Sequence, residues 1–318
     1  FKADRPDGAT GVEVIDTQGA PRYCGVTIRG VEVKESPDWL RQRLEAIGVR
    51  SINNVVDITN YILHGIGQPL HCFDLNTVEG GKIVVRTVEE GTKFVTLDGV
   101  ERALNSADLM ICDAVKPMCI GGVFGGLNSG VTENTTDIFI ESACFNPTRI
   151  RRTARRHGLS TDASFRYERG LDPNAAMYAL KLAAIMVKEL AGGEICGEPV
   201  DIYSEKAEPF KVTLSYNYLN SLIGKELPRE TVDAILKSLE MEITDRRGDE
   251  IDLLVPNYRV DVQRPCDVVE DVLRIYGYNN VEIGTTVHSS LQLKTPVDAA
   301  DDLQKLISEQ LTAQGFNE

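Results

Sequence analysis

The chain has 318 residues, of which 42% are hydrophobic and 26% are charged, proportions that are typical of a soluble globular protein. Its length favours two domains and leaves room for a third. With 34 Lys and Arg against 48 Asp and Glu, its net charge is −14, which argues against a dedicated DNA or RNA clamp.

Membrane, secreted and zinc-binding proteins are also disfavoured. The longest apolar runs, such as residues 183–187, are far too short to span a bilayer, and the start has no signal-peptide pattern. The seven cysteines include no CxxC pair, which argues against a disulfide framework and a zinc ribbon. We therefore predict a cytoplasmic protein with no membrane partner. Because residue 1 is Phe, we expect a fragment of something longer.

The first half of the chain predicts alternating helices and strands. Ser36-Pro37 followed by apolar residues and Gly48 predicts a helix with Ser36 as N-cap and Pro37 at N1. Residues 55–63 fit either a short helix or a buried strand. The sequence further predicts strands over residues 82–86, 108–112 and 137–141, a turn at Asp98-Gly99, and a long helix from residues 172–173 to 190.

A cluster of charge and proline near residues 204–209 predicts a domain boundary. A smaller, winged-helix-like pattern follows, with strands over residues 212–214 and 251–255 and helices over residues 216–223, 228–239 and 267–276. The whole chain is predicted to be α+β, with a mixed sheet in the first part. We expect domains over residues 1–207 and 208–280, and the start of another over residues 281–318.

Residues 157–170 lack both the strand and the helix period, which predicts a polar surface loop. The loop is either ordinary or arranged around a small ligand. Residues 149–169 contain seven arginines against Asp162 and Glu168. This basic strip could steer an RNA end, or it could be a solvated helix whose arginines pair with acids elsewhere.

Three smaller features could carry chemistry. The glycines of residues 121–126 lack the Walker Lys-Ser/Thr, so a glycine-rich turn is favoured over a phosphate loop. His64 and His71 are seven residues apart, which argues against a helical metal pair, and each alone is more often structural. Glu141 ends a predicted apolar strand and, if buried, needs a donor such as a phenolic O–H.

These features occur together in one known family. Residues 53–61, 67–74, 121–126, Glu141 and residues 157–170 occur in the order seen in the bacterial phenylalanyl-tRNA synthetase beta subunit. The resemblance covers roughly residues 23–280. Its first part resembles the B3/B4 editing module, and its second part, through residues 256–261 and 267–278, resembles B5. Residues after about 282 look like the start of the family's inactive synthetase-like domain.

The resemblance implies that the first part hydrolyses tyrosine wrongly esterified to phenylalanine tRNA. A synthetic pocket for Phe rejects Tyr only weakly, whereas a site built to bind the phenol can select it. By family match, Glu141 would accept the phenolic proton, the Gly125 N–H would donate to the same oxygen, and Thr161 and Ala163 would line the amino-acid pocket. His71 would orient water or the tRNA end, and His71, Glu141 and Thr161 form the expected catalytic set. The alternative is a scaffold that docks tRNA and the alpha subunit without turnover.

The resemblance also implies a magnesium site in the second part. Asp261, Asp267, Glu270 and Asp271 match the family's ligating acids, in a site shared with the alpha subunit. Asp271 stands where the family often has Glu, which puts direct coordination there in question, and a solvated acidic face is the alternative. ATP would be used on the alpha subunit of a two-alpha, two-beta enzyme and not bound by this chain. The acidic last helix argues against nucleic-acid binding by the winged-helix-like part.

Overall fold

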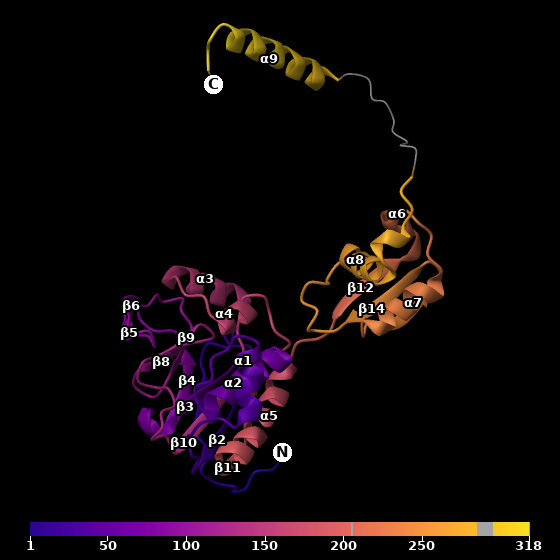
Figure 1. Cartoon of the computed structure of the whole chain (residues 1–318). Helices are drawn as coiled ribbons and strands as arrows, with labels where there is room; N and C mark the ends of the chain where they lie inside the picture. The colour runs from indigo at the N-terminus through magenta and orange to yellow at the C-terminus, as the bar shows by residue number, and fades with distance from the viewer. Residues whose placement is uncertain (205, 285–294, 318) are drawn as a thin grey trace. The chain divides into compact units, whose positions relative to one another are not determined.

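The computed structural model describes residues 1–204, 206–284 and 295–317 (Figure 1). Residues 1–275 form one compact unit and residues 276–318 a second. The fold is α+β, as predicted. Part of the segment expected to begin a further domain, residues 285–294 and 318, lies outside the described residues.

A four-stranded antiparallel sheet forms the centre of the first part. Its strand order is β11-β2-β10-β3, with bounds Glu194–Tyr203, Arg22–Arg29, Asp137–Cys144 and Leu70–Asp74. Strand β10 continues three residues beyond the predicted end, so Glu141 lies within the strand and not at its end. Glu141 is paired on both sides, opposite Gly25 of β2 and His71 of β3.

The two faces of this sheet bury different cores, because successive side chains of a strand point to opposite faces. Cys24, Val26 and Ile28 of β2 face one core, together with Ile138 and Ile140 of β10. The alternate residues Tyr23, Phe73, Phe139 and Ala143 face the other core. The sheet is therefore buried on both sides, and its second face is the one that carries Glu141.

Helices cover the first face (Figure 1). These are α1 (Asp38–Ala46), α2 (Asn54–Ile66) and α5 (Ala175–Ala191), with the last two in mutual contact. Helix α2 settles the helix-or-strand alternative, because the Asn53 side chain accepts the Val56 amide and Gly67 ends the helix at φ 81°. The predicted Ser36 cap is wrong. Pro37 occupies the N-cap position, and the Ser36 hydroxyl donates instead to Asp57 at 2.5 Å.

A mixed five-stranded sheet contributes the second core. Its order is β1-β4-β7-β8-β9, with bounds Gly11–Val14, Lys82–Arg86, Met110–Cys112, Pro117–Ile120 and Phe124–Gly125. Only the β1–β4 pair is parallel among these described strands. A short hairpin of β5 (Lys93–Val95) and β6 (Glu101–Ala103) turns at the predicted Asp98-Gly99, where Gly99 has φ 76°.

Two helices follow β10, and one of them corrects the loop prediction for residues 157–170. Helix α3 spans Pro147–His157, and α4 spans Asp162–Tyr167. Thr161 and Ser164 form a reciprocal capping box at the start of α4. A helix of six residues is too short to display a 3.6-residue period, which is why the pattern indicated a loop.

The second part has the predicted order of helices and strands with one addition. Strand β14 (Glu250–Val255) pairs on one side with β12 (Phe210–Ser215) and on the other with β13 (Glu242–Arg247), which the sequence did not predict. Strand β13 lies at the sheet edge and is mostly exposed, so its charged residues hid its identity. The helices are α6 (Tyr216–Ile223), α7 (Arg229–Ser238) and α8 (Pro265–Tyr276).

The second unit contains helix α9, Pro296–Ala313. Over the described parts of the chain, no helix combines the length and the apolar character that crossing a bilayer requires.

Candidate active site

A cavity of about 250 Å³ opens beside the second face of the central sheet. It brings together His71 from β3, Gly125 from β9, Glu141 from β10, and Thr161 and Ala163 at the start of α4. All five residues expected to bind or hydrolyse a substrate thus line one cavity. Its size suits one aromatic side chain, since cavities of roughly 150 Å³ hold a benzene molecule.

Glu141 is the acidic group of this cavity. It is 4% exposed, and its Oε2 accepts a hydrogen bond of 2.7 Å from the hydroxyl of Tyr23. Burial raises the pKa of Glu141 to about 7, against the opposing effect of the Tyr23 hydrogen bond. Within the described chain, no hydrogen bond reaches Oε1 of Glu141. The carboxyl can therefore change its protonation state near neutral pH while keeping one oxygen for a ligand.

His71 lies directly across the strand pair from Glu141. Its ring packs edge-on against Phe73, with centroids 4.5 Å apart, and its buried Nε2 has no hydrogen-bond partner among the described residues. Burial lowers the pKa of His71 to about 4. The imidazole is therefore neutral at pH 7 and presents an unused polar atom in a buried setting.

Within residues 121–126, three positions require glycine for different structural reasons. A Cβ on Gly125 would lie 2.9 Å from Leu97 Cδ1 and 3.3 Å from His71 Cε1, so a side chain there would intrude beside the cavity. A Cβ on Gly126 would meet the Met118 carbonyl oxygen at 2.4 Å, and Gly122 has φ 67°. The segment is a turn and strand that needs close backbone approach, as the glycine-rich-turn interpretation predicted.

Thr161 is held by backbone groups. Its hydroxyl donates to the Val123 carbonyl at 2.9 Å and accepts the Ser164 amide at 3.0 Å. The hydroxyl proton of Thr161 is used in the bond to the Val123 carbonyl. Thr161 therefore acts by holding the cavity wall, including the nearby Ala163, in place. The bond also ties α4 to the glycine-rich segment.

Sequence reasoning missed two tyrosines of the site. Tyr23 supplies the donor that a buried Glu141 requires, and Tyr167 lines the cavity with its hydroxyl 3.4 Å from the Pro69 carbonyl. Both are nearly inaccessible to solvent, and burial raises the pKa of each hydroxyl. The need for a donor was visible in the sequence, but the strand pairing that brings Tyr23 to Glu141 was not.

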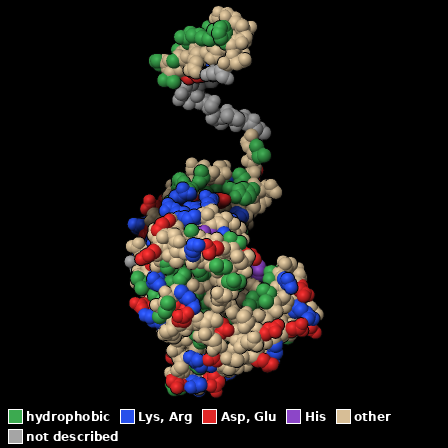
Figure 2. All heavy atoms as spheres, turned by 90° about the vertical axis from the view of Figure 1, so that its left-hand side faces the viewer, with side chains coloured by type: hydrophobic (Ala, Val, Ile, Leu, Met, Phe, Trp, Pro, Cys, Tyr) green, Lys and Arg blue, Asp and Glu red, His purple; other side chains and the backbone are tan. Residues whose placement is uncertain are grey.

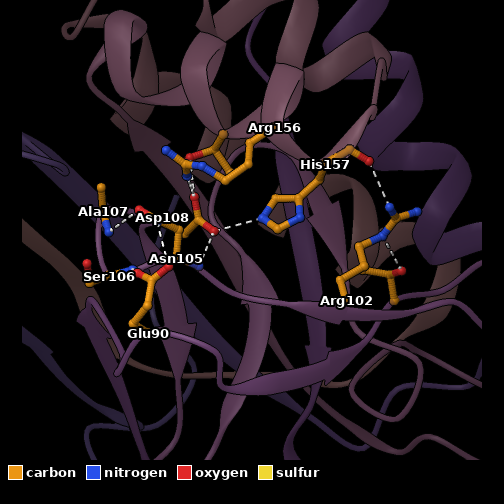
Figure 3. Close-up of polar contacts among 10 residues, drawn as sticks. Glu90, Arg102, Asn105, Ser106, Ala107, Asp108, Arg156 and His157 are labelled. Atoms are coloured by element: carbon orange, nitrogen blue, oxygen red, sulfur yellow. Dashed lines mark hydrogen bonds and ion pairs between the residues drawn. The ribbon is translucent and has the colours of Figure 1, made fainter.

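Another histidine, His157, lies outside this cavity. Its Nε2 is 2.7 Å from Asp108 Oδ2, and Thr153 and Arg156 bind the other oxygen of the same carboxylate (Figure 3). Burial acts to raise the pKa of Asp108, but the Asn105 amide and the His157 and Thr153 side chains together lower it. This cluster fastens α3 to the second core and is structural.

The four acids predicted to bind magnesium lie together, but most are neutralised. They line one pocket of about 380 Å³ with Arg259 and Arg274. Arg259 is 3.1 Å from Asp261 and 2.6 Å from Asp271, while Arg264 is 2.8 Å from Asp267. Glu270 is the exception, with no ion pair to any described residue.

This arrangement does not fit a divalent cation. Arg259 and Arg264 instead supply the positive charge beside three of the four carboxylates. Over the described ranges, no group of three or more His, Cys, Asp or Glu side chains is placed to hold a metal ion. We derive no chemical step from magnesium, and binding by these acids stays a prediction that requires Arg259 to move.

Comparison with known proteins places both parts in families. The family model described as "B3/4 domain" matches residues 19–192, and the "tRNA synthetase B5 domain" model matches residues 212–278. The phenylalanine–tRNA ligase beta subunit of Bacteroides fragilis strain YCH46 is 59% identical over 100% of this chain and 39% of its own length. That of Porphyromonas gingivalis is 54% identical over 98% of this chain and 38% of its own length.

A solved structure of an N-terminal fragment of the phenylalanyl-tRNA synthetase beta-subunit from Pyrococcus horikoshii is more distant. It aligns with a TM-score of 0.43 and 18% identity over 87% of this chain and 78% of its own. The chain thus spans about 39% of the length of the curated relatives it matches.

Proposed function

Because the chain belongs to the B3/4 domain family, we propose that it is the editing portion of a phenylalanine–tRNA ligase beta subunit and hydrolyses tyrosine wrongly esterified to phenylalanine tRNA. The observation that carries this proposal is the single cavity that His71, Gly125, Glu141, Thr161 and Ala163 line together. Had Glu141 and Gly125 lain in different cavities, they could not have contacted one phenolic oxygen.

Selectivity in this proposal comes from the carboxylate. Tyr23 holds Oε2 of Glu141, which leaves Oε1 to accept the phenolic proton of a tyrosyl group. A phenylalanyl group would leave that oxygen buried and unpaired, at a cost of about 1–3 kcal/mol. This difference corresponds to a preference for tyrosine of roughly five- to 150-fold. The Gly125 N–H is proposed as the second partner of the phenol.

Hydrolysis needs little further chemistry, because an aminoacyl ester is already reactive and a held water near its carbonyl is sufficient. The unpaired Nε2 of His71 is suited to orient such a water or the RNA end. With a pKa near 4, His71 is a weak base at neutral pH. We therefore assign it a positioning role, and we assign Thr161 the support of the cavity wall.

The remaining assignments follow the relatives. We propose the phenylalanine–tRNA ligase alpha subunit and phenylalanine tRNA as partners, in a two-alpha, two-beta assembly in the cytoplasm. ATP and Mg²⁺ would serve aminoacylation on the alpha subunit. The second part, residues 208–280, would support assembly, and residues 281–318 would begin the next domain of the beta subunit.

The test is a deacylation assay with tyrosyl and phenylalanyl esters of phenylalanine tRNA. We expect this chain, alone and assembled with the alpha subunit, to release tyrosine faster than phenylalanine. Glu141→Ala should abolish that preference, whereas Glu230→Ala, an exposed acid on α7, should keep it. Ester loss at the buffer rate in both preparations would instead favour a docking scaffold without turnover.

A further inference from the structure

Helix α3 exposes a cluster of arginines that no acid of the described residues neutralises. Arg151, Arg152 and Arg155 are exposed, and none forms an ion pair with a described residue. The other two arginines of the helix are used internally, Arg149 by Asp16 and Arg156 by Asp108. Figure 2 shows the side of the molecule on which α3 lies in Figure 1, and Lys and Arg side chains gather near the top of the large body in that view.

The fold does not require this cluster. Arg151 and Arg155 are four residues apart, a spacing at which like charges destabilise a helix. Arg155 gains from the negative end of the helix, but Arg151 and Arg152 do not. In a chain of net charge −14, acids to neutralise them are abundant. An exposed basic helix face that has no ion-pair partner in the described part of the chain is therefore suited to an external anion.

The neighbouring helix adds a flat aromatic surface. Helix α4 packs against α3 and carries Phe165, whose side chain is 51% exposed. The guanidinium of Arg169 lies over the Phe165 ring, 3.5 Å from its centroid. Aromatic rings and guanidinium planes are the groups on which proteins stack the bases of single-stranded RNA.

Both features adjoin the cavity. Helix α3 ends at His157, and four residues later Thr161 begins the wall of the cavity. Asp162, Ala163 and Tyr167 of α4 line that cavity, while Phe165 is exposed. A strand whose end entered the cavity would therefore pass these helices.

We propose that the outer faces of α3 and α4 bind the single-stranded end of an RNA, with Arg151, Arg152 and Arg155 on its phosphates and Phe165 with Arg169 stacking a base. The proposal rests on the proposed function, because it assigns the surface that brings an esterified RNA end to the cavity. It explains how a strongly acidic chain could bind RNA at one place only.

The experiment measures affinity for two fluorescent probes over a range of salt concentrations. The probes are phenylalanine tRNA without an esterified amino acid and a single-stranded ribo-oligonucleotide ending in CCA. Replacing Arg151, Arg152 and Arg155 by Ala should weaken oligonucleotide binding at least tenfold at low salt. It should also reduce the slope of log K against log salt by about 2, at roughly 0.7 per phosphate contact. Phe165→Ala should weaken binding about fivefold or more and leave the slope unchanged.

The matched control removes three exposed positive charges elsewhere, by Ala at Arg50, Lys211 and Lys237. Equal losses of RNA affinity in the two triple variants would show that the effect depends only on net charge, and would overturn the proposal. Unchanged RNA affinity in the α3 variant would also overturn it. A loss of alpha-subunit binding in place of RNA binding would also overturn it. Free tyrosine binding separates the two claims: the α3 variant should retain it, whereas its absence in the unmodified chain would contradict the proposed function.

Discussion

The hydroxyl of Tyr23 donates a 2.7 Å hydrogen bond to Oε2 of Glu141, so a tyrosine of the protein already holds one oxygen of the carboxyl proposed to recognise a tyrosyl group. The bond fixes the orientation of the carboxyl and stabilises its charged form against burial. Recognition and acid strength therefore depend on the same contact.

Replacing Tyr23 by Phe should raise the pKa of Glu141 above about 7, because the hydrogen bond that lowers it is lost while burial remains. Carbon-13 NMR of the Glu141 carboxyl during a pH titration measures this directly. The pH midpoint of tyrosine binding should move upward with it. Tyr61→Phe, a change of another partly buried tyrosine, provides the control. An unchanged midpoint for Glu141 would show that Tyr23 does not tune it.

Glu141 should make the protein less stable as the pH rises. Its pKa is raised from 4.5 to about 7, so the folded state favours the protonated form. The associated stability is present below pH 4.5 and is lost as the pH rises through 7. Its size is roughly 3 kcal/mol, at about 1.4 kcal/mol per unit. Urea unfolding at pH 5 and pH 8 should therefore show this loss in the unmodified chain and not in Glu141→Gln.

The two glycines at the end of the glycine-rich segment should respond differently to alanine. Gly126→Ala places a Cβ against the Met118 carbonyl, which cannot yield, and should cost about 2 kcal/mol or more of stability. Gly125→Ala meets the end of the Leu97 side chain, which is 48% exposed and can move. It should cost less than about 1 kcal/mol of stability but weaken tyrosine binding. Thermal unfolding and calorimetric titration distinguish the two outcomes, and equal destabilisation would contradict this prediction.

Asp108 should be important for the stability of α3. Asp108→Asn removes a buried charge that His157, Arg156 and Thr153 bind, and the expected loss is about 3 kcal/mol at pH 7. Thr153→Val removes one neutral donor and should cost about 1 kcal/mol. Amide hydrogen exchange should show faster opening of α3 in the Asp variant. If the two variants lose the same stability, the charge of Asp108 is not the main contribution.

The sequence predicted the α+β class, most helices and the five residues that meet in the cavity, but not how they are held. Glu141 was expected at a strand end, yet β10 continues through Ser142 and Ala143 by pairing with β2, and through Ser142 by pairing with β3. Pairing register is set by contacts distant in sequence. For the same reason Tyr23, 118 residues away from Glu141 along the chain, could not be identified as its partner.

Short helices and edge strands were also not predicted from the sequence. The capping box of Thr161 and Ser164 was present in the sequence, but α4 is only six residues long and showed no period. The arginines that surround the acids of α8 were equally visible. Which of them pair with Asp261 and Asp271 depends on the fold of the preceding turn, so the ion pairs could not be predicted from the sequence, and magnesium binding by these acids stays a prediction.

Gly25 of β2 lies opposite Glu141 of β10, and it has no room for a side chain. A Cβ there would lie 2.0 Å from the Cζ atom of Phe139, whose ring fills the space. The two positions should therefore be mutationally coupled: Gly25→Ala is expected to be severely destabilising with Phe at position 139 and far milder with Leu there. A double-mutant cycle would measure this coupling. It also means that exchanging the ring alone would let water approach the carboxyl, so that inherited changes at a hydrophobic position could alter the proposed tyrosine recognition without touching any residue assigned to it.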